Sequence, residues 1–599
     1  MRGIVKGIGA ALLALAAFAM RAQVVTADFG KANPVEGVRS EGRCLLCSPG
    51  GGADCTLLCA SQVEGELTVL LSGIESVVSV MRLADDLCSF RADRSVATVG
   101  NAVTFKGVGC WSVSVRRAAA KPVAAVSSEP DGEAFSVSRM FSANGVLPRE
   151  VEVPVWGRGE PGADVSVEFA GQRVAGKIAA DGTWQVALKP LAACAEGRPL
   201  VIVSGDRRIE LADCLVGDVW LCGGQSNMEF RFDMGECDYA KYEAESVQYP
   251  AIRWMKIDRR ASEEPQPYLF HYAWGGEASW TPASKAFGRL TCAGYYFARR
   301  IHRETGVPIG FIDAAWNGSR IEPFIPQFDA DGRLAKAGKE GRSFNAMLTP
   351  LVKFPLRGVI WYQGCSNSGD GFAYADRQLQ LVRGWRRAWG RELPFYYVQL
   401  SSLGEQGVDA KGRDRNPVGS GFAKVREGQR RFLKMADGTG MAVSIDVGDP
   451  KDVHAKSKKL VGDRLAQLAL AGTYGRKIVP AGPNVTAAAV EAGGKVRLHF
   501  ENVGGGLITC AKDWRNNDDP TPTPGARIEG FVVSGEPDGK GRTWHAAEAV
   551  VDGDCVVVGA AAVPAPKAVA YAHRANPMGA CNLYNRELLP AAPFIIDVE

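Results

Sequence analysis

The sequence predicts an α/β protein in which a central parallel sheet is flanked by β-rich domains. Between residues 217 and 478, short apolar runs typical of buried strands alternate with longer helical stretches, which favours a parallel sheet covered by helices. Before and after this region, short strand-like runs separated by turn signals indicate β-sandwich domains. At 599 residues the chain is too long for one hydrophobic core, so several domains are expected.

Residues 1–22 have the features of a secretory signal peptide. Arg2 and Lys6 precede an apolar run over 8–19, and small residues near its end offer cleavage sites. No later segment approaches the roughly 18 consecutive apolar residues that a spanning helix needs. We therefore expect a secreted or periplasmic protein without stable membrane insertion after cleavage, with an uncleaved anchor as the alternative.

Residues 23–130 are predicted to form a cysteine-rich β module followed by a linker. Runs up to about Ala118 alternate apolar and polar residues, and the stretch 118–132 is rich in Ala, Pro and Ser. An even number of cysteines in a short exported segment favours disulfides, with a zinc site as the alternative and the pairing left open. The six cysteines are Cys44, Cys47, Cys55, Cys59, Cys88 and Cys110.

Two further β domains are predicted, a β-sandwich over 131–216 and a C-terminal domain over 479–599. In the first, the run 151–157 alternates apolar and polar residues, and Asp181-Gly182 is a hairpin signal. In the second, short β runs such as 496–500 return.

Apolar strands and helices are predicted to alternate through the region 217–478. The ends of parallel strands are where catalytic residues gather in α/β proteins, so the chemistry is sought there. The strand candidates are 220–222, 309–312, 358–361, 395–400 and 441–445, and the helix candidates include 294–304 and 458–470.

Charge and composition exclude some classes of function. The net charge of +4 is small for this length, and Lys and Arg are interspersed with Asp and Glu, which argues against nucleic acid as a partner. No cluster within 217–480 has metal-ligand spacing, so neither a metal nor an organic cofactor is expected there.

Ser226 is the candidate nucleophile. A strand-like run ends in two glycines and the serine follows two residues later, which presents its hydroxyl on a tight turn at a strand end. A serine hydroxyl needs a base, and among the six histidines His454 stands out because it follows a predicted strand. The acids Asp452 and Asp449, two and five positions before it, are candidates to orient its ring.

An acyl-transfer site also needs hydrogen-bond donors for the developing oxyanion. Gly318 follows one predicted strand and can bring its backbone N–H close to a ligand. Gln363 follows the next predicted strand and offers a side-chain amide. Each signal alone is weak, but together they lie in order on successive strands.

These blocks resemble the SGNH hydrolase superfamily, and within it the sialate O-acetylesterase group of carbohydrate esterases. The resemblance runs from about Phe135 to the C-terminus and leaves 23–130 outside it. The serine block is highly specific and the glycine block moderately so. The matching blocks are Gly217-Asp218-Val219-Trp220-Leu221-Cys222, Gly224-Gln225-Ser226-Asn227-Met228, Ala315-Trp316-Asn317-Gly318-Ser319-Arg320-Ile321-Glu322, Trp361-Tyr362-Gln363-Gly364 and Asp452-Val453-His454.

The resemblance implies a flavodoxin-like three-layer α/β/α domain between the β-sandwich domains, with no cofactor. It implies that Ser226 is the nucleophile and His454 the base, with Asp452 the first candidate to orient the base. The oxyanion would be held by the N–H groups of Ser226 and Gly318 and by the amide of Gln363.

The chain departs from the group in two places. Cys365 stands where members usually carry Glu after Gln-Gly, and Lys451 stands where many SGNH enzymes carry Asp three residues before the histidine. Arg320 and Glu322 follow the oxyanion glycine and either contact the substrate or form a local ion pair.

The expected function is a serine esterase that removes O-acetyl groups from sugars, with O-acetylated sialic acid as the first substrate. Acetylated xylan or another polysaccharide is the alternative within this class. A non-catalytic carbohydrate-binding relative is the alternative from another class, and retention of the serine, the histidine and the oxyanion donors argues against it.

Overall fold

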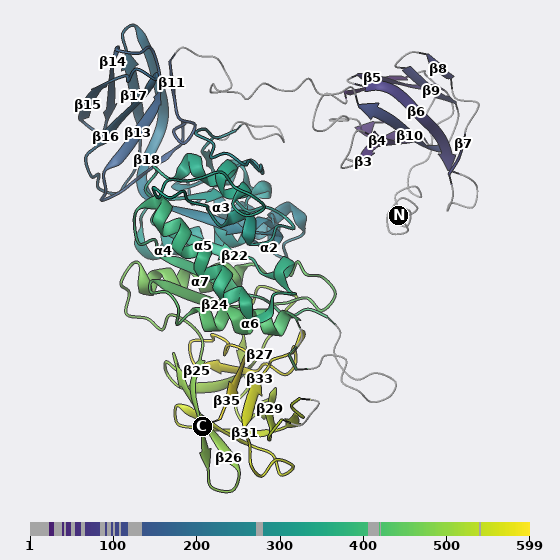
Figure 1. Cartoon of the computed structure of the whole chain (residues 1–599), viewed down its shortest axis with the longest axis vertical. Coiled ribbons are helices and arrows are strands. Elements are labelled where there is room, and N and C mark those ends of the chain that lie inside the picture. The colour runs from purple at the N-terminus through teal and green to yellow at the C-terminus, as the bar shows by residue number, and fades with distance from the viewer. Residues whose placement is uncertain are drawn as a thin grey trace. The chain divides into compact units, whose positions relative to one another are not determined.

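The computed structural model describes residues 135–270, 279–404, 418–419, 421–537 and 541–598, and the backbone pairing of the strands between Gln23 and Arg117 (Figure 1). The chain divides into two compact units, 1–131 with 273–275, and 132–272 with 276–599. The predicted signal peptide, the predicted linker and the side chains of the six early cysteines lie outside the described residues.

The described backbone of the first unit contains ten strands in two sheets. One sheet has the order β1-β5-β9-β8 and the other β2-β3-β4-β10-β6-β7, and only the β1–β5 pair is parallel. The strands are β1 (Gln23–Asp28), β2 (Arg39–Ser40), β3 (Arg43–Ser48), β4 (Asp54–Ser61), β5 (Glu66–Ser72), β6 (Ile74–Leu83), β7 (Phe90–Ala92), β8 (Ala97–Val99), β9 (Ala102–Lys106) and β10 (Gly109–Arg117).

The second unit begins with mostly antiparallel strands that enclose an apolar core. β16 alternates exposed and buried residues along its length, and Trp184 of this strand stacks on Phe135 with ring centroids 6.2 Å apart. The strands are β11 (Ser136–Val137), β12 (Val146–Pro148), β13 (Val153–Arg158), β14 (Asp164–Phe169), β15 (Gln172–Lys177), β16 (Thr183–Leu188) and β17 (Cys194–Ser204).

Strand β18 (Arg207–Gly224) belongs to two domains at once. Its first half pairs antiparallel with β17, and its second half pairs in parallel with β21 and β22 of the next domain. The strand does not break at Gly217, where a β-carbon would lie 2.0 Å from the carbonyl oxygen of Pro308. This glycine therefore serves a close backbone approach.

The central sheet is built from parallel strands. The spatial order is β19-β21-β18-β22-β23-β24, and β20 pairs antiparallel with β19 at one edge. Every strand segment predicted within 217–478 lies in or next to a strand of this sheet. Besides β18, the strands of the sheet are β19 (Ile252–Lys256), β20 (Thr281–Pro282), β21 (Ile309–Asp313), β22 (Gly358–Tyr362), β23 (Phe395–Gln399) and β24 (Thr439–Val443).

Helices pack against this sheet through two aromatic contacts. Trp220 of β18 packs on Phe297 of α4 at 4.9 Å, and Trp361 of β22 packs on Trp385 of α5 at 5.7 Å. A β-carbon at Gly223 would touch both Trp361 and Trp385, and residues 220 and 223 of one strand point to opposite faces. Thus α4 and α5 cover opposite faces.

The helices are α2 (Ser226–Glu229), α3 (Tyr239–Ser246), α4 (Cys292–Thr305), α5 (Tyr374–Trp389), α6 (Gly421–Phe432) and α7 (Lys459–Gly472). Shorter helical segments are η1 (Phe232–Met234), η2 (Ala283–Lys285), η3 (Phe287–Arg289), η4 (Glu322–Phe324), η5 (Phe344–Leu348), η6 (Thr349–Leu351), η7 (Cys365–Asn367) and η8 (Gly371–Ala373). Within the described residues, none of the helices is long and apolar enough to cross a bilayer.

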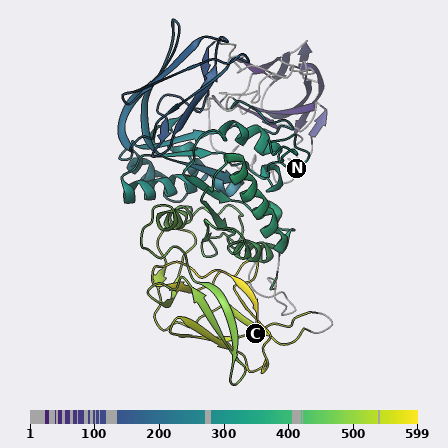
Figure 2. The same ribbon diagram turned by 60° about the vertical axis from the view of Figure 1, so that its left-hand side comes forward.

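The C-terminal domain consists of antiparallel strands (Figure 2). A buried network joins it to the central domain, because Asp446 after β24 accepts hydrogen bonds from Arg464 of α7 and Tyr584 of β34. The strands are β25 (Asn484–Glu491), β26 (Lys495–Glu501), β27 (Leu507–Ala511), β28 (Thr521–Pro522), β29 (Phe531–Ser534), β30 (His545–Ala546), β31 (Glu548–Asp552), β32 (Cys555–Gly559), β33 (Ala568–Tyr571), β34 (Leu583–Asn585) and β35 (Phe594–Asp597).

Candidate active site

Ser226 is the first residue of α2, directly after the end of β18. Gly224 has φ +133°, and a β-carbon there would lie 2.2 Å from the carbonyl oxygen of Tyr362, so only glycine fits this turn. The next N–H, that of Gln225, donates to the same carbonyl at 3.0 Å. Ser226 is 6% exposed. The strand-to-helix turn predicted for the serine is therefore present.

Neighbours of Ser226 connect its turn to two other loops. Gln225 accepts hydrogen bonds at its side-chain Oε1 from the N–H groups of Gly364 and Ser366, at 3.1 and 3.3 Å. Asn227 donates from Nδ2 to the backbone carbonyl of Val453 at 2.9 Å. These bonds tie the serine turn to the loop after β22 and to the loop that carries His454.

His454 lies in the loop after β24, as the sequence predicts for a base. Its ring Nδ1 lies 3.4 Å from Oδ1 of Asp452, which also accepts the backbone N–H of His454 at 2.9 Å. Its Nε2 is buried and has no hydrogen-bond partner among the described residues. Asp449 accepts the N–H groups of Lys451 and Asp452, so it shapes the loop.

Gly318 lies in the turn after β21, with φ +72°. A β-carbon there would meet no atom within 4 Å, so open space lies beside it. The N–H of Trp316 donates to the carbonyl of Gly224 at 3.0 Å, which fixes this turn against the serine turn. The backbone N–H groups of Ser226 and Gly318 have no acceptor in the described part of the chain, as oxyanion donors require before substrate binds.

Gln363 is fully buried, and its side-chain amide is already engaged. Nε2 donates to the carbonyl of Ser319 at 3.2 Å and to Oδ1 of Asn367 at 2.7 Å, while Oε1 accepts from Tyr374 at 2.6 Å. A primary amide has two N–H groups. Gln363 can therefore contact an oxyanion only if it gives up one of these bonds, and here it positions the 318–321 turn.

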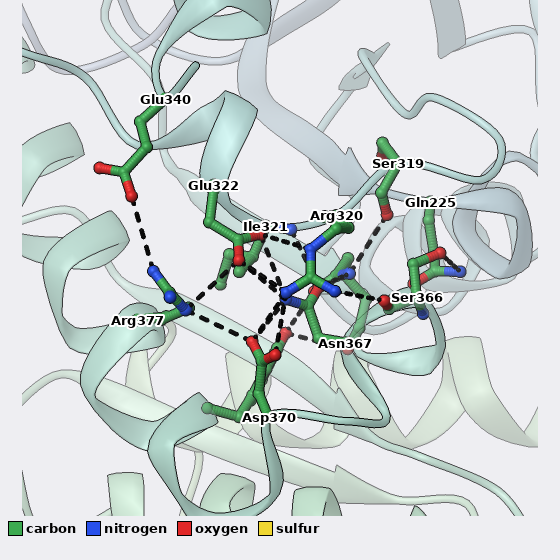
Figure 3. A network of polar contacts seen from close by, with 12 residues as sticks. Gln225, Ser319, Arg320, Ile321, Glu322, Glu340, Ser366, Asn367, Asp370 and Arg377 are labelled. Carbon is green, nitrogen blue, oxygen red and sulfur yellow. Dashed lines mark hydrogen bonds and ion pairs between the residues drawn. The ribbon is translucent and has the colours of Figure 1, made fainter. Parts of the chain in front are cut away.

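Arg320 and Glu322 form an ion pair at 2.8 Å (Figure 3). Arg320 also pairs with Asp370 at 2.9 Å and donates to the carbonyl of Ser366 at 3.0 Å. Hydrogen bonds with Glu322 and then Asp370 raise the pKa of the Arg320 guanidinium. Arg377 contacts both carboxylates, at 3.3 Å each. The network ties the glycine turn to the loop after β22.

Asn367 and Lys458 are two buried site residues that the sequence reasoning missed. The side chain of Asn367 accepts from Gln363 and Ile321 and donates to Asp370 at 2.8 Å. Lys458 donates to Asn227 Oδ1 at 2.7 Å. The signal available was their placement, Asn367 four residues after Gln363 and Lys458 four residues after His454.

Cys365, the substitution noted in the sequence, is half-buried in η7. Its Sγ lies 3.9 Å from Nδ2 of Asn227. Burial raises the pKa of its thiol to about 11, so it is a thiol at neutral pH and a poor nucleophile. Within the described residues there is no group of three or more His, Cys, Asp or Glu side chains that could hold a metal ion.

Comparisons with known proteins indicate the class of this protein. Residues 216–471 match the family described as "Carbohydrate esterase, sialic acid-specific acetylesterase". Sialate O-acetylesterases from Homo sapiens and Mus musculus are 27% and 25% identical over 397 and 394 residues, which cover 58% and 54% of this chain and 72% and 70% of theirs. The solved carbohydrate acetylesterase from Xanthomonas citri is 34% identical, with TM-score 0.66, over 77% of this chain and 99% of its own.

The α/β sheet, the serine turn and these matches define a carboxylic ester hydrolase. Within that class, the chain belongs to the SGNH family of sialate O-acetylesterase-like carbohydrate esterases.

Proposed function

We propose that this enzyme removes O-acetyl groups from sugars, with O-acetylated sialic acid as substrate, through an acetyl-Ser226 intermediate. The observation that carries the proposal is the convergence of two loops on the serine turn at the end of β18. Hydrogen bonds from Trp316 to Gly224 and from Asn227 to Val453 bring the glycine turn and the loop of His454 to the serine. The sialate O-acetylesterases among its relatives support the substrate.

In the proposed mechanism, Ser226 Oγ attacks the acetyl carbonyl while Nε2 of His454 takes its proton. The unpaired N–H groups of Ser226 and Gly318 receive the oxyanion. His454 then protonates the departing sugar hydroxyl, and a water activated by the same ring hydrolyses the acetyl-enzyme. Asp452 orients the ring from its 3.4 Å contact with Nδ1. The empty bonding position on the buried Nε2 supports its role as the proton acceptor.

We also propose the finer organisation of the chain. The central domain is a flavodoxin-like three-layer α/β/α hydrolase domain over 217–478, with β-sandwich-type domains over 131–216 and 479–599. The coverage of opposite sheet faces by α4 and α5 supports the three layers. Export through a signal peptide at 1–22 remains part of this proposal.

A second candidate substrate is a neutral acetylated polysaccharide such as acetylxylan. Sialic acid carries a carboxylate, which a protein usually meets with a cation that is free to bind it. Arg320, the predicted substrate-binding cation, instead donates from Nε, Nη1 and Nη2 to Glu322, Asp370 and the Ser366 carbonyl. A neutral sugar would not need to displace these carboxylates.

Two assays test the proposal. Wild type and Ser226→Ala are compared on p-nitrophenyl acetate, where the variant should fall to the rate of the uncatalysed reaction. Equal turnover by both proteins would reject Ser226 as the nucleophile. Acetate release from O-acetylated sialic acid and from acetylated xylan then decides between the two substrates.

A further inference from the structure

Lys458 is a lysine whose side chain lies wholly inside the protein, with 0% of its surface exposed. Its ammonium group donates to Oδ1 of Asn227 at 2.7 Å and to the backbone carbonyl of Ala455. In the described part of the chain, both hydrogen-bond acceptors are neutral and no carboxylate forms an ion pair with it. Burying an unpaired charge is costly, so a compensating role is expected.

The ammonium group lies over two aromatic rings of the candidate site. It lies 4.9 Å from the ring centroid of Phe230 and 5.8 Å from that of Tyr362. The Phe230 ring also stacks on His454, with centroids 6.3 Å apart and planes 26° apart. Such rings attract a cation but leave it without solvent.

Four titratable groups on other elements face Lys458 at longer range. They are Cys292 of α4, Cys365 after β22, Asp452 of the His454 loop and Glu236 after η1. Their charges raise the pKa of Lys458 by less than the loss of hydration lowers it, so burial brings this pKa down to about 8. The group therefore changes charge within the pH range in which an esterase can be assayed.

The C-terminal domain holds Lys458 in its inward orientation. Asn517 accepts hydrogen bonds at Oδ1 from the side chain of Ser457 and from the backbone N–H of Lys459, both at 3.2 Å. Its Nδ2 donates to Glu236 at 2.6 Å. Both neighbours of Lys458 are thus bound by one buried asparagine.

We propose that Lys458 is a positioning residue of the esterase reaction, acting through Asn227. Its charge binds the Asn227 carbonyl oxygen and so strengthens the bond that Asn227 donates to Val453, which holds the turn of Ser226 against the loop of His454. This inference rests on the proposed function, because it assumes that Ser226 passes its proton to His454.

The test compares Lys458→Met, which has similar volume and no charge, and Lys458→Gln, which keeps an N–H donor without charge. Lys459→Met is the matched control. The ammonium group of Lys459 forms an ion pair of 2.9 Å with Asp463, and this pair lies away from the candidate site. We measure kcat and KM on p-nitrophenyl acetate between pH 6 and 9.5 and subtract the Ser226→Ala rate at each pH.

Both Lys458 variants should lose at least about tenfold in kcat at pH 7, with KM changed by less than about threefold. Wild-type kcat should fall as pH rises through about 8, and this alkaline fall should be absent from the variants. Lys459→Met should behave as wild type.

Wild-type kcat in Lys458→Gln would overturn the proposal. A lowered kcat that keeps the alkaline fall would also overturn it, because it would show a structural role alone. If circular dichroism shows that neither variant folds, the pH profile of wild-type kcat is the deciding measurement. A wild-type kcat that does not fall near pH 8 would then reject the proposal. If Ser226→Ala is as active as wild type, the proposed function has failed instead.

Discussion

Asn227 donates a 2.9 Å hydrogen bond to the backbone carbonyl of Val453, so the residue after the proposed nucleophile holds the residue before the proposed base. Two segments more than two hundred residues apart in the sequence are joined by this one amide. The relative placement of Ser226 and His454 therefore depends on a side chain that takes no proton itself.

Replacement of Asn227 should separate the activity of the enzyme from its stability. Asn227→Asp keeps an acceptor for Lys458 but loses the donor to Val453, so kcat should fall by about tenfold or more. Asn227→Ala also removes the side-chain acceptor of Lys458. Its free energy of unfolding should be about 1–3 kcal/mol lower than that of Asn227→Asp, which is the cost of leaving a buried donor without a hydrogen-bond partner. Urea denaturation and p-nitrophenyl acetate kinetics measure both effects. Equal kcat in Asn227→Asp and wild type would show that the bond to Val453 is dispensable.

Gly318→Ala should slow catalysis through the backbone alone. Its φ of +72° is costly for alanine, by about 1 kcal/mol, and its β-carbon meets no atom within 4 Å. The turn should shift and misplace its N–H, so kcat/KM should fall by about tenfold, less than the hundredfold or so for complete loss of a donor.

Gly390→Ala is the matched control for this substitution. Gly390 ends α5 with φ +63° and also has open space beside it. It should lose similar stability and keep wild-type kcat/KM. Equal losses of activity in both variants would mean that Gly318 matters only for folding.

Asp452 should matter more for the rate than Asp449. Asp452→Asn removes the negative charge beside Nδ1 of His454, and we expect kcat to fall by at least about tenfold. The loss should stay well below that of a buried triad acid, because the Asp452 side chain is 47% exposed. Asp449→Asn, measured in parallel, should keep most of the activity because Asp449 contacts backbone N–H groups of the loop. The reverse order would assign the orienting role to Asp449.

His573 should make the fold sensitive to acid. It is buried, and loss of water lowers its pKa from 6.5 to about 4. Between these values the unfolded chain binds a proton that the folded chain does not. Stability is therefore lost as pH falls from 6.5, approaching about 3 kcal/mol near pH 4.

Urea denaturation of wild type and His573→Phe at pH 7 and pH 4.5 measures this acid sensitivity. The variant should lose less stability than wild type on acidification. The same change at exposed His499 is measured in parallel as a control for the loss of an imidazole ring. If wild type and His573→Phe lose the same free energy of unfolding between pH 7 and pH 4.5, His573 is not the source of the acid sensitivity.

Five strands of the central sheet, β18 and β21 to β24, could be predicted because each contains a continuous apolar run, as strands covered on both faces do. β19 (Ile252–Lys256) was not predicted, because Arg253 and Lys256 interrupt its apolar residues. β21 (Ile309–Asp313) and β22 (Gly358–Tyr362) agree with the predicted segments to within a residue. The helices α5 and α6 were not predicted. Each contains an internal glycine, Gly384 or Gly428, which allows close packing on Pro326 or on the backbone of Gly371, a contact that the sequence pattern does not show.

The site could be predicted where it depends on chain order and not where it depends on long-range polar contacts. The turn of Ser226 and the loop of His454 follow from a strand end and its next residues. The full engagement of Gln363 needs Ser319, Asn367 and Tyr374 at once, and spacing along the chain does not show which donors a buried amide satisfies.

Strand β18 gives the enzyme a mechanical property. Its 18 residues lead from the pairing with β17 to the turn of Ser226, with an irregular register around Asp213, whose φ is +55°. A gene fragment that starts at residue 217 would begin in mid-strand and lose the part of β18 that pairs with β17, while keeping the pairing with β21 and β22. A force on the first part of this strand would be carried along one backbone segment to the turn of Ser226, through the irregular residue Asp213.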